Sequence, residues 1–314
     1  MSDSYASIIV PLDGSAIAEG AIRFALTIAG RTGTRARVEL VHVHDEGVLV
    51  ANAPMMDSRW DDDRAGEMGG AVRAVAERLT RETGLAVTAV TLRGTAAAAL
   101  LEHAADRAAD LIVMTTHGRS GFSRAWFGSV AERVIHASTI PVLVVRVGEH
   151  ERADVAEPLF RHVLLPIDRE QSGAEAMQRA LAVGTPGRTA YTLLTVVSPL
   201  PVLPPPYPTA GVFVGGGDLA RSVAEASALL ERIAAPAQAG GAAVDIRVAT
   251  HDRAAPAILE VAESGADLIV LPTHPRSAFS RALLGSVVDK VMRGARVPVL
   301  LFRASPTTEI LPKA

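Results

Sequence analysis

The chain has 314 residues, of which 49% are hydrophobic, 21% charged and 4% aromatic, with a formal net charge of −3 at pH 7. This length exceeds what one hydrophobic core usually serves, so we expect two domains. The absence of cysteine excludes disulfides, thiol nucleophiles and thiolate metal sites. Without a broad positive charge or a run of Lys and Arg, the chain is not expected to bind nucleic acid.

Strands and helices are predicted to alternate through the first half. Short β-branched apolar runs predict strands at 7–12, 36–43, 86–92, 110–115 and 141–146. Apolar residues at helical spacing predict helices at 16–29, 71–82 and 96–107. The alternation indicates an α/β, Rossmann-like domain, in which an open parallel sheet is covered by helices on both faces.

The second half repeats the first. Residues 109–146 begin ADLIVMTTHGRSGF, and residues 266–303 begin ADLIVLPTHPRSAF. IIVPLD, which ends at Asp13, matches VLLPID, which ends at Asp168. Equivalent strands are predicted at 162–167, 189–197, 243–249, 267–272 and 298–303. We therefore predict two tandem domains, 1–147 and 159–304, with a charged linker at 148–158 and a tail at 305–314.

Two long connections, 44–64 and 199–218, follow the second strand of each half. Connections of this length are typical of binding lids or of mobile linkers, and both interpretations stay open. The chain begins without a basic and apolar leader, and it contains no apolar run of the roughly 20 residues that span a bilayer. We expect a soluble, cytoplasmic protein that does not enter membranes.

Two strand ends in the first half carry candidate ligand-binding residues, because ligands of open parallel sheets bind beyond the carboxyl ends of the strands. The first is Pro11-Leu12-Asp13-Gly14-Ser15. In the simpler interpretation, Asp13 or Ser15 only caps the following helix and Gly14 allows the turn.

The second strand end runs through MTTHGRSG, residues 114–121, to GSVAE, residues 128–132. Glycines let the backbone approach a phosphate, and the start of a helix at Gly128-Ser129 favours an anion. The alternative is structural, because Ser129 and Glu132 also fit an S-x-x-E capping box. The pattern is neither a P-loop nor a dinucleotide-binding turn.

A metal site and an efficient catalytic site are not predicted. His42 and His44 share a strand face and His117 could lie near them, but no third ligand has suitable spacing. No nucleophile is accompanied by a base and an orienting acid, and Asp13 has no partner carboxylate.

At these residues the chain resembles the universal stress protein family, in its tandem two-domain form, over essentially the whole length. The family's nucleotide signature is G-x-x-G, nine residues, then G-[ST]. Here Thr115 stands at the first glycine, followed by Gly118 and Gly128-Ser129. Asp13 matches the family's first-strand element, and Val43 matches the residue that ends the second strand beside the adenine.

The resemblance implies an ATP site, with Mg²⁺ or Mn²⁺ as a candidate companion. Asp13 and Val43 would hold the adenosine. The implied site consists of Pro11, Leu12, Asp13, Val43, Met114, Thr115, His117, Gly118, Gly128, Ser129 and Val130. The Cβ of Thr115 could narrow the phosphate approach, whereas its hydroxyl could bind ribose or phosphate.

The second half departs further from the signature, because its frame reads Pro272-Thr273-His274-Pro275 before Gly285-Ser286. Proline has no backbone N–H to donate to a phosphate. We expect the second site to be empty or weak.

The implied function is an ATP-binding stress-response regulator that holds nucleotide in its first half, changes its binding to a protein partner, and hydrolyses ATP slowly at most. The alternatives are a nucleotide-independent interaction scaffold and an enzyme related to nucleotidyl transferases. In the family, the fifth strand pairs across a dimer. The two halves are therefore expected to form an intramolecular pseudo-dimer, and a homodimer of chains is a further alternative.

Overall fold

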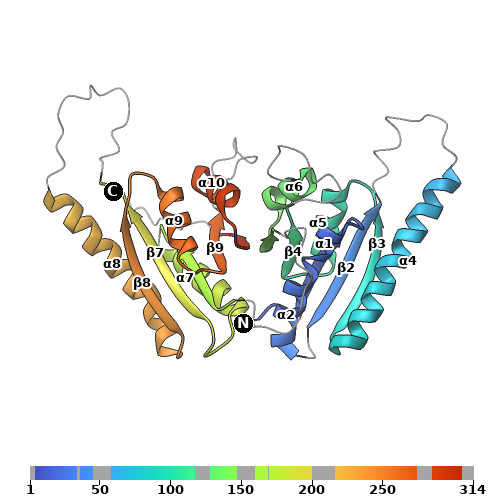
Figure 1. The fold of residues 1–314 in the computed structure, drawn as a ribbon, viewed down its shortest axis with the longest axis horizontal. Coiled ribbons are helices and arrows are strands. Elements are labelled where there is room, and N and C mark those ends of the chain that lie inside the picture. Colours follow the sequence, from blue (N-terminus) through green and yellow to red (C-terminus); the bar gives the residue numbers. More distant parts are fainter. Residues whose placement is uncertain are drawn as a thin grey trace, which may run out of the picture. The chain divides into compact units, whose positions relative to one another are not determined.

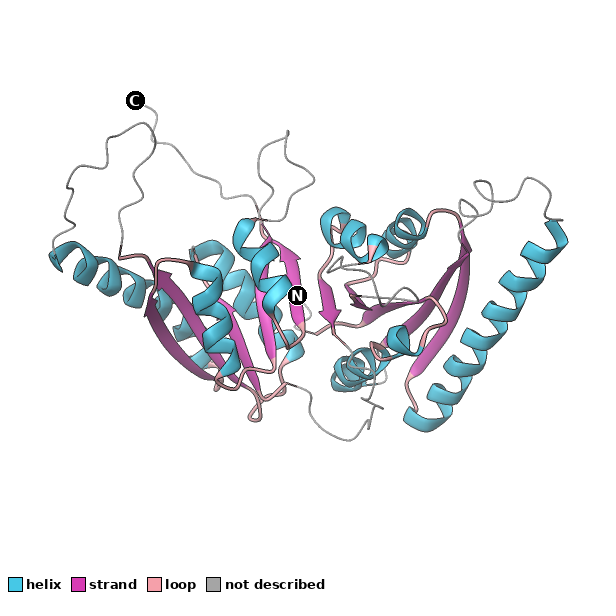
Figure 2. Cartoon of the chain, turned by 45° about the horizontal axis from the view of Figure 1, so that its top comes forward, coloured by secondary structure: helices cyan, strands magenta, loops and turns pink. Residues whose placement is uncertain are grey.

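The structure, a computed structural model, describes residues 4–33, 36–44, 58–116, 128–146, 160–168, 170–199, 216–273 and 285–305. The chain divides into two compact units, one built mainly from Met1–Leu159 and the other mainly from Phe160–Ser280. Each unit is a sheet flanked by helices (Figures 1 and 2), which confirms the predicted α/β class. The predicted linker 148–158 lies outside the described residues, as does the tail beyond residue 305.

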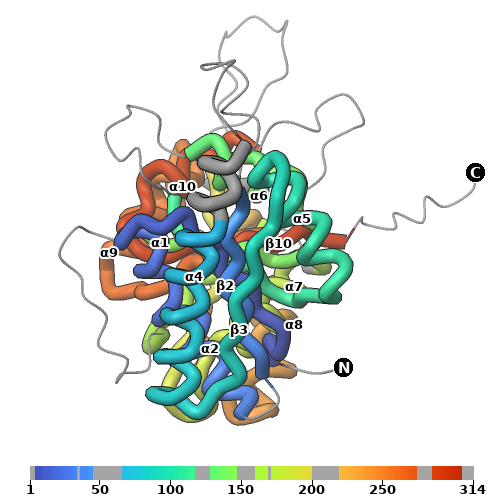
Figure 3. The backbone as a smooth tube through the Cα atoms, turned by 90° about the vertical axis from the view of Figure 1, so that its right-hand side faces the viewer, coloured from blue at the N-terminus to red at the C-terminus, as the bar shows by residue number. Residues whose placement is uncertain are grey.

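The first unit contains parallel strands in the order β3-β2-β1-β4-β5. They are β1 (Ser7–Leu12), β2 (Arg37–His44), β3 (Ala86–Arg93), β4 (Leu111–Thr115) and β5 (Val142–Val145). The helices are α1 (Ala16–Glu19), α2 (Ile22–Thr32), α4 (Ser58–Thr83), α5 (Ala96–Asp106) and α6 (Ser129–Ala137). Right-handed crossovers place α1, α2 and α4 on one face and α5 and α6 on the other. Figure 3 shows α4 running alongside β2 and β3.

The chain reverses its direction across this sheet after β3. It passes from β1 outward to β3 and then returns to β4, on the other side of β1. The point between β1 and β4 is therefore the topological switch point, where ligands of open α/β sheets bind.

The start of β4 is anchored to β1 by one carboxylate. Asp110 accepts hydrogen bonds from the backbone N–H of Ala6 at 2.9 Å and of Ser7 at 3.1 Å. Burial raises the pKa of the Asp110 carboxyl, although these backbone hydrogen bonds act in the opposite direction. In the second unit, the Asp267 carboxylate likewise accepts hydrogen bonds from the backbone N–H of Arg161 at 2.6 Å and of His162 at 3.1 Å. The aspartate in both copies of ADLIV is thus explained by strand anchoring.

The predicted helix 16–29 is wrong in one respect, since the structure contains two helices there. The N–H of Gly20 donates to the carbonyl of Ile17 at 3.1 Å, and that of Ala21 donates to Ala18 at 3.2 Å. These tight turns break the regular helical pattern and separate α1 from α2. The apolar periodicity continues across the break, which is why the sequence pattern did not reveal it.

The predicted connection at 44–64 is also too long, because α4 begins at Ser58. The run of three aspartates that follows Trp60 in the sequence is favourable near the positive end of a helix dipole, and this signal was overlooked. Residues 45–57 lie outside the described part of the chain, so the choice between a lid and a linker stays open. The same holds for residues 200–215, after which α8 begins at Gly216.

The second unit repeats the plan, with its strands in the order β10-β9-β6-β7-β8. They are β6 (His162–Pro166), β7 (Ala190–Val197), β8 (Ala243–Thr250), β9 (Leu268–Thr273) and β10 (Val299–Arg303). The helices are α7 (Glu170–Val183), α8 (Gly216–Ala239), α9 (Ala254–Glu263) and α10 (Ser286–Gly294). Within the described ranges of both units, no helix combines the length and the hydropathy that a membrane span requires.

Candidate functional site

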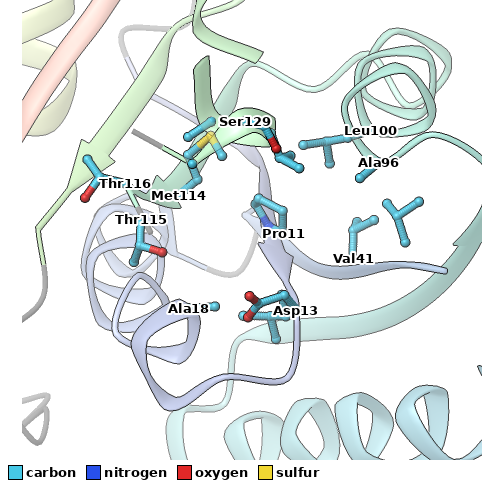
Figure 4. A pocket seen from close by; sticks show the side chains of 15 residues that line it. Pro11, Asp13, Ala18, Val41, Ala96, Leu100, Met114, Thr115, Thr116 and Ser129 are labelled. Carbon is cyan, nitrogen blue, oxygen red and sulfur yellow. The ribbon is translucent and has the colours of Figure 1, made fainter. Parts of the chain in front are cut away.

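A cavity of about 270 Å³ opens in the first unit beyond the carboxyl ends of β1, β2 and β4, at the switch point (Figure 4). The predicted site residues that the structure describes all line it: Pro11, Leu12, Asp13, Val43, Met114, Thr115, Gly128, Ser129 and Val130. His117 and Gly118 lie outside the described residues. The structure thus brings four separate sequence segments (residues 11–13, 43, 114–115 and 128–130) to one cavity.

Several further lining residues were not predicted from the sequence: Ala18, Val41, Ala96, Leu100, Thr116 and Ala131. Val41 could have been found, because it precedes Val43 by two positions and shares its strand face. Ala96 and Leu100 share a face of α5, since they are four residues apart. The sequence does not reveal that this helix face forms a cavity wall.

The cavity walls are mainly apolar. Val41 and Val43 of β2 form one wall, and Leu100 of α5, which is fully buried, forms another. The polar groups among the described lining residues are the Asp13 carboxylate and the hydroxyls of Thr115, Thr116 and Ser129. An apolar hollow with a few polar groups is typical of small-molecule sites.

The segment after β1 performs both roles that the sequence suggested. Gly14 has a positive φ of 80°, and Ser15 is the N-cap of α1, accepting a hydrogen bond from the backbone N–H of Ala18 at 3.1 Å. Asp13 lines the cavity and also accepts hydrogen bonds from the hydroxyl of Ser15 at 2.6 Å and from its backbone N–H at 3.0 Å. The cap and the cavity carboxylate therefore belong to one hydrogen-bonded turn.

The capping-box prediction for α6 is wrong. The N-cap residue is Gly128, with φ −65° and ψ 147°, and the helix start has no side-chain cap hydrogen bond. Ser129 is already the first helical residue, so its hydroxyl does not stand where a capping box requires it. The N-cap residue of α6 is therefore a glycine, which has no side chain to occupy the first amides of the helix.

Gly128 places the start of α6 directly against the end of β4. Its N–H donates to the carbonyl of Thr116 at 2.7 Å. A Cβ at this position would lie 3.3 Å from the same carbonyl oxygen, a tight contact. Gly128 also lines the cavity beside the start of α6.

A charge cluster lies on the α5 side of β2, where the buried Glu39 carboxylate meets His103 and the half-exposed Arg107. The Glu39 carboxylate accepts a hydrogen bond from Nη2 of Arg107 at 2.8 Å and contacts Nε2 of His103 closely. Burial raises the pKa of the Glu39 carboxyl, but the hydrogen bonds from Arg107 and His103 outweigh it and hold the pKa below its ordinary value. The cluster joins β2 to α5, the two elements that form the apolar walls of the cavity.

His42 has a structural contact. It is 7% exposed, and its Nδ1 lies 2.9 Å from the carbonyl oxygen of Leu12. Among the residues that the structure describes, no group of three or more His, Asp or Glu side chains could hold a metal ion.

The equivalent positions of the second unit differ. Asp168 is exposed, and its carboxylate accepts a hydrogen bond from Ser172 at 3.1 Å. Pro272 occupies the place of Thr115 within β9. Helix α10 begins after Gly285 without a side-chain cap, like α6. Both units therefore start this helix after a glycine N-cap. They differ in the hydrogen-bond partner of the aspartate after the first strand and in the residue near the end of the fourth strand, Thr115 in one unit and Pro272 in the other.

Duplicated open parallel α/β domains with a cavity at the switch point define a Rossmann-like class of protein. The sequence model of the universal stress protein family matches residues 4–146 and 159–303. The chain therefore belongs to the universal stress protein family, with two copies of the domain in tandem.

Individual relatives agree with this assignment. A universal stress protein of Mycobacterium tuberculosis is 26% identical over 307 residues, which are 95% of this chain and 97% of that protein. One from Methanocaldococcus jannaschii is 33% identical over 144 residues, 45% of this chain and 82% of that protein. A solved universal stress protein from Archaeoglobus fulgidus has a TM-score of 0.69 and 18% identity, over 97% of this chain and 99% of that one. The last likeness is one of fold.

Proposed function

We propose that this universal stress protein binds ATP in the cavity of its first unit and acts as a nucleotide-dependent regulator in a stress response. The observation that carries the proposal is an apolar cavity at the switch point, bordered by a helix start whose N-cap residue is the glycine Gly128. Binding of nucleotide would alter the surface around the cavity and thereby the affinity for a protein partner.

The residues of the cavity fit the parts of a nucleotide. Val41, Val43 and Leu100 offer apolar surface to a base. The carboxylate of Asp13 can accept hydrogen bonds from the base or the sugar. The backbone amides at the start of α6 and the positive end of its dipole favour phosphate, and Mg²⁺ or Mn²⁺ would offset the remaining phosphate charge.

Thr115 is compatible with this assignment. Figure 4 shows its hydroxyl and the Asp13 carboxylate pointing into the same space from opposite sides of the cavity. Threonine thus adds a hydrogen-bonding group at the place where the family signature has a glycine without a side chain. We propose that this hydroxyl contacts the sugar or the first phosphate.

The scaffold alternative keeps the Gly128-Ser129 element only as a helix cap. Gly128 is the N-cap residue of α6 and Ser129 is not, so the helix start is compatible with both accounts. Thr115 and the prolines of the second half remain the features that favour it. The cytoplasmic location and the pairing of the two halves stay predictions.

Calorimetric titration of the nucleotide-stripped protein with Mg-ATP tests the proposal. We expect about one ATP per chain, and strong loss of binding in Gly128→Ala, because a Cβ there obstructs the helix start. Gly285→Ala is the matched control, since this glycine is the N-cap of α10 and an added Cβ would meet none of the described residues within 4 Å.

Two other outcomes would change the conclusion. If both glycine variants each lose half of the bound ATP, the two units bind equally and the asymmetric assignment is wrong. ATP at a hundredfold excess over Kd would stabilise the protein by about 2.7 kcal/mol. If the wild type shows neither binding heat nor a thermal shift at millimolar Mg-ATP, the nucleotide-independent scaffold is the better account.

A further inference from the structure

The Asp13 carboxylate is held in place by a neighbour that does not line the cavity. Its Oδ1 accepts both the hydroxyl of Ser15, at 2.6 Å, and the backbone N–H of Ser15, at 3.0 Å. The Ser15 hydroxyl oxygen in turn accepts the N–H of Ala18 at 3.1 Å. Because every contact in this chain is short and local, the direction of the carboxylate is tied to the start of α1.

A second contact holds the peptide group that precedes Asp13. Nδ1 of His42 lies 2.9 Å from the carbonyl oxygen of Leu12, and this oxygen belongs to the peptide that Leu12 shares with Asp13. A carbonyl only accepts, so Nδ1 carries the hydrogen of this bond. His42 is buried and is not a lining residue. His42 can therefore influence the cavity only indirectly, by fixing the backbone at the end of β1.

The second unit keeps one of these contacts and lacks the other. Thr195 stands where His42 stands, and its hydroxyl donates to the carbonyl of Ile167 at 3.0 Å. Glu170 replaces Ser15 in the duplicated sequence. The Asp168 carboxylate accepts instead from Ser172, four residues further along, and is exposed.

We propose that Ser15 and His42 are positioning residues of the first unit's ligand site, which hold the Asp13 carboxylate toward the bound nucleotide. The inference rests on the proposed function. It also provides a reason for the difference between the units that is independent of the prolines in the second half, because Asp168 lacks the Ser15 contact.

The test is a double-mutant cycle on Mg-ATP binding, measured by calorimetry on the full chain. Ser15→Ala and His42→Val should each raise Kd about tenfold, the effect of losing one hydrogen bond to or near a charged group. Ser15→Thr and His42→Thr keep a hydroxyl that can make each contact, as Thr195 does in the second unit. These two variants should bind within about threefold of the wild type, because each keeps a hydroxyl donor at the position of the lost contact.

The decisive readout is the same pair of substitutions in an Asp13→Ala background. If Ser15 and His42 act through Asp13, their effects on Kd should fall below about twofold there. Effects of full size in that background, or threonine variants as weak as Ser15→Ala and His42→Val, would overturn the proposal.

Variants of the second unit are the controls for general destabilisation. Thr195→Val and Ser172→Ala remove the corresponding hydroxyls and should leave Kd unchanged. Urea unfolding shows whether each variant is folded at the titration temperature. If Ser15→Ala is not folded, the comparison of His42→Val with His42→Thr still tests the proposal. Absence of ATP binding by the wild type would overturn the proposed function itself, whereas wild-type binding that is insensitive to Ser15 and His42 would overturn only this inference.

Discussion

Replacing Glu39 by glutamine tests how much the charge cluster of Glu39, His103 and Arg107 contributes to the stability of the first unit. The Glu39 side chain is 9% exposed, and its carboxylate is bound by Arg107 and His103. Because these hydrogen bonds outweigh the opposing effect of burial, the pKa of the carboxyl is lowered. Glutamine has nearly the same shape but no charge to attract the two partners.

The sign of the pH dependence follows from the lowered pKa. The unfolded chain has an ordinary glutamate pKa of about 4.3. The ionised carboxylate therefore stabilises the folded first unit above that pH, and this contribution is lost as the pH falls through the lower folded pKa. Hydrogen bonds to charged groups contribute about 1.5 to 3 kcal/mol. We expect Glu39→Gln to cost about 2 kcal/mol at pH 7, or about 4 to 8 °C in Tm, and clearly less at pH 3, because protonation of Glu39 removes the charge that the substitution removes.

Urea unfolding followed by tryptophan fluorescence at both pH values measures this difference. Both tryptophans, Trp60 and Trp126, belong to the first half of the sequence. Glu77→Gln is the matched control, because Glu77 is an exposed residue of α4 in the same unit. An equal loss of stability at pH 7 and pH 3, or a loss at pH 7 no larger than that of Glu77→Gln, would refute the reasoning.

Three further predictions concern the core, the strand anchor and the chemistry. Leu100→Ala should destabilise the first unit by about 2 to 5 kcal/mol, because Leu100 is fully buried, and urea unfolding checks this. Asp110→Ala should destabilise the first unit more than Asp110→Asn at pH 7, and urea unfolding checks this as well. Both substitutions remove the ionised carboxylate, which burial disfavours, as the raised pKa of Asp110 indicates. Only asparagine keeps an acceptor for the backbone N–H groups of Ala6 and Ser7. Phosphate release from Mg-ATP should be far below one turnover per second, slower than typical enzymes, and a turnover in the ordinary enzymatic range with a defined acceptor would favour a transferase.

Much of the architecture was predictable from local patterns. The alternation of β-branched runs with helical periodicity predicted the parallel sheet, and the duplicated ADLIV and GSV segments predicted two copies of it. The ends of β1 and β4 were predicted to meet, since strand ends of a parallel sheet share one edge. Asp13, Thr115 and Gly128 could therefore be assigned to one site before any contact was known.

The remaining features depend on contacts between segments far apart in the chain. Leu100 reads as an ordinary core residue, and only the packing of α5 against β2 makes it a cavity wall. Ser129 reads as a cap, but the bond from Gly128 to Thr116 starts α6 one residue earlier. Asp13 and Asp168 read alike in sequence, yet Ser15 holds one and Ser172 the other. Periodicity records which residues a local element buries, whereas the tertiary structure alone determines which distant groups they meet and where they point.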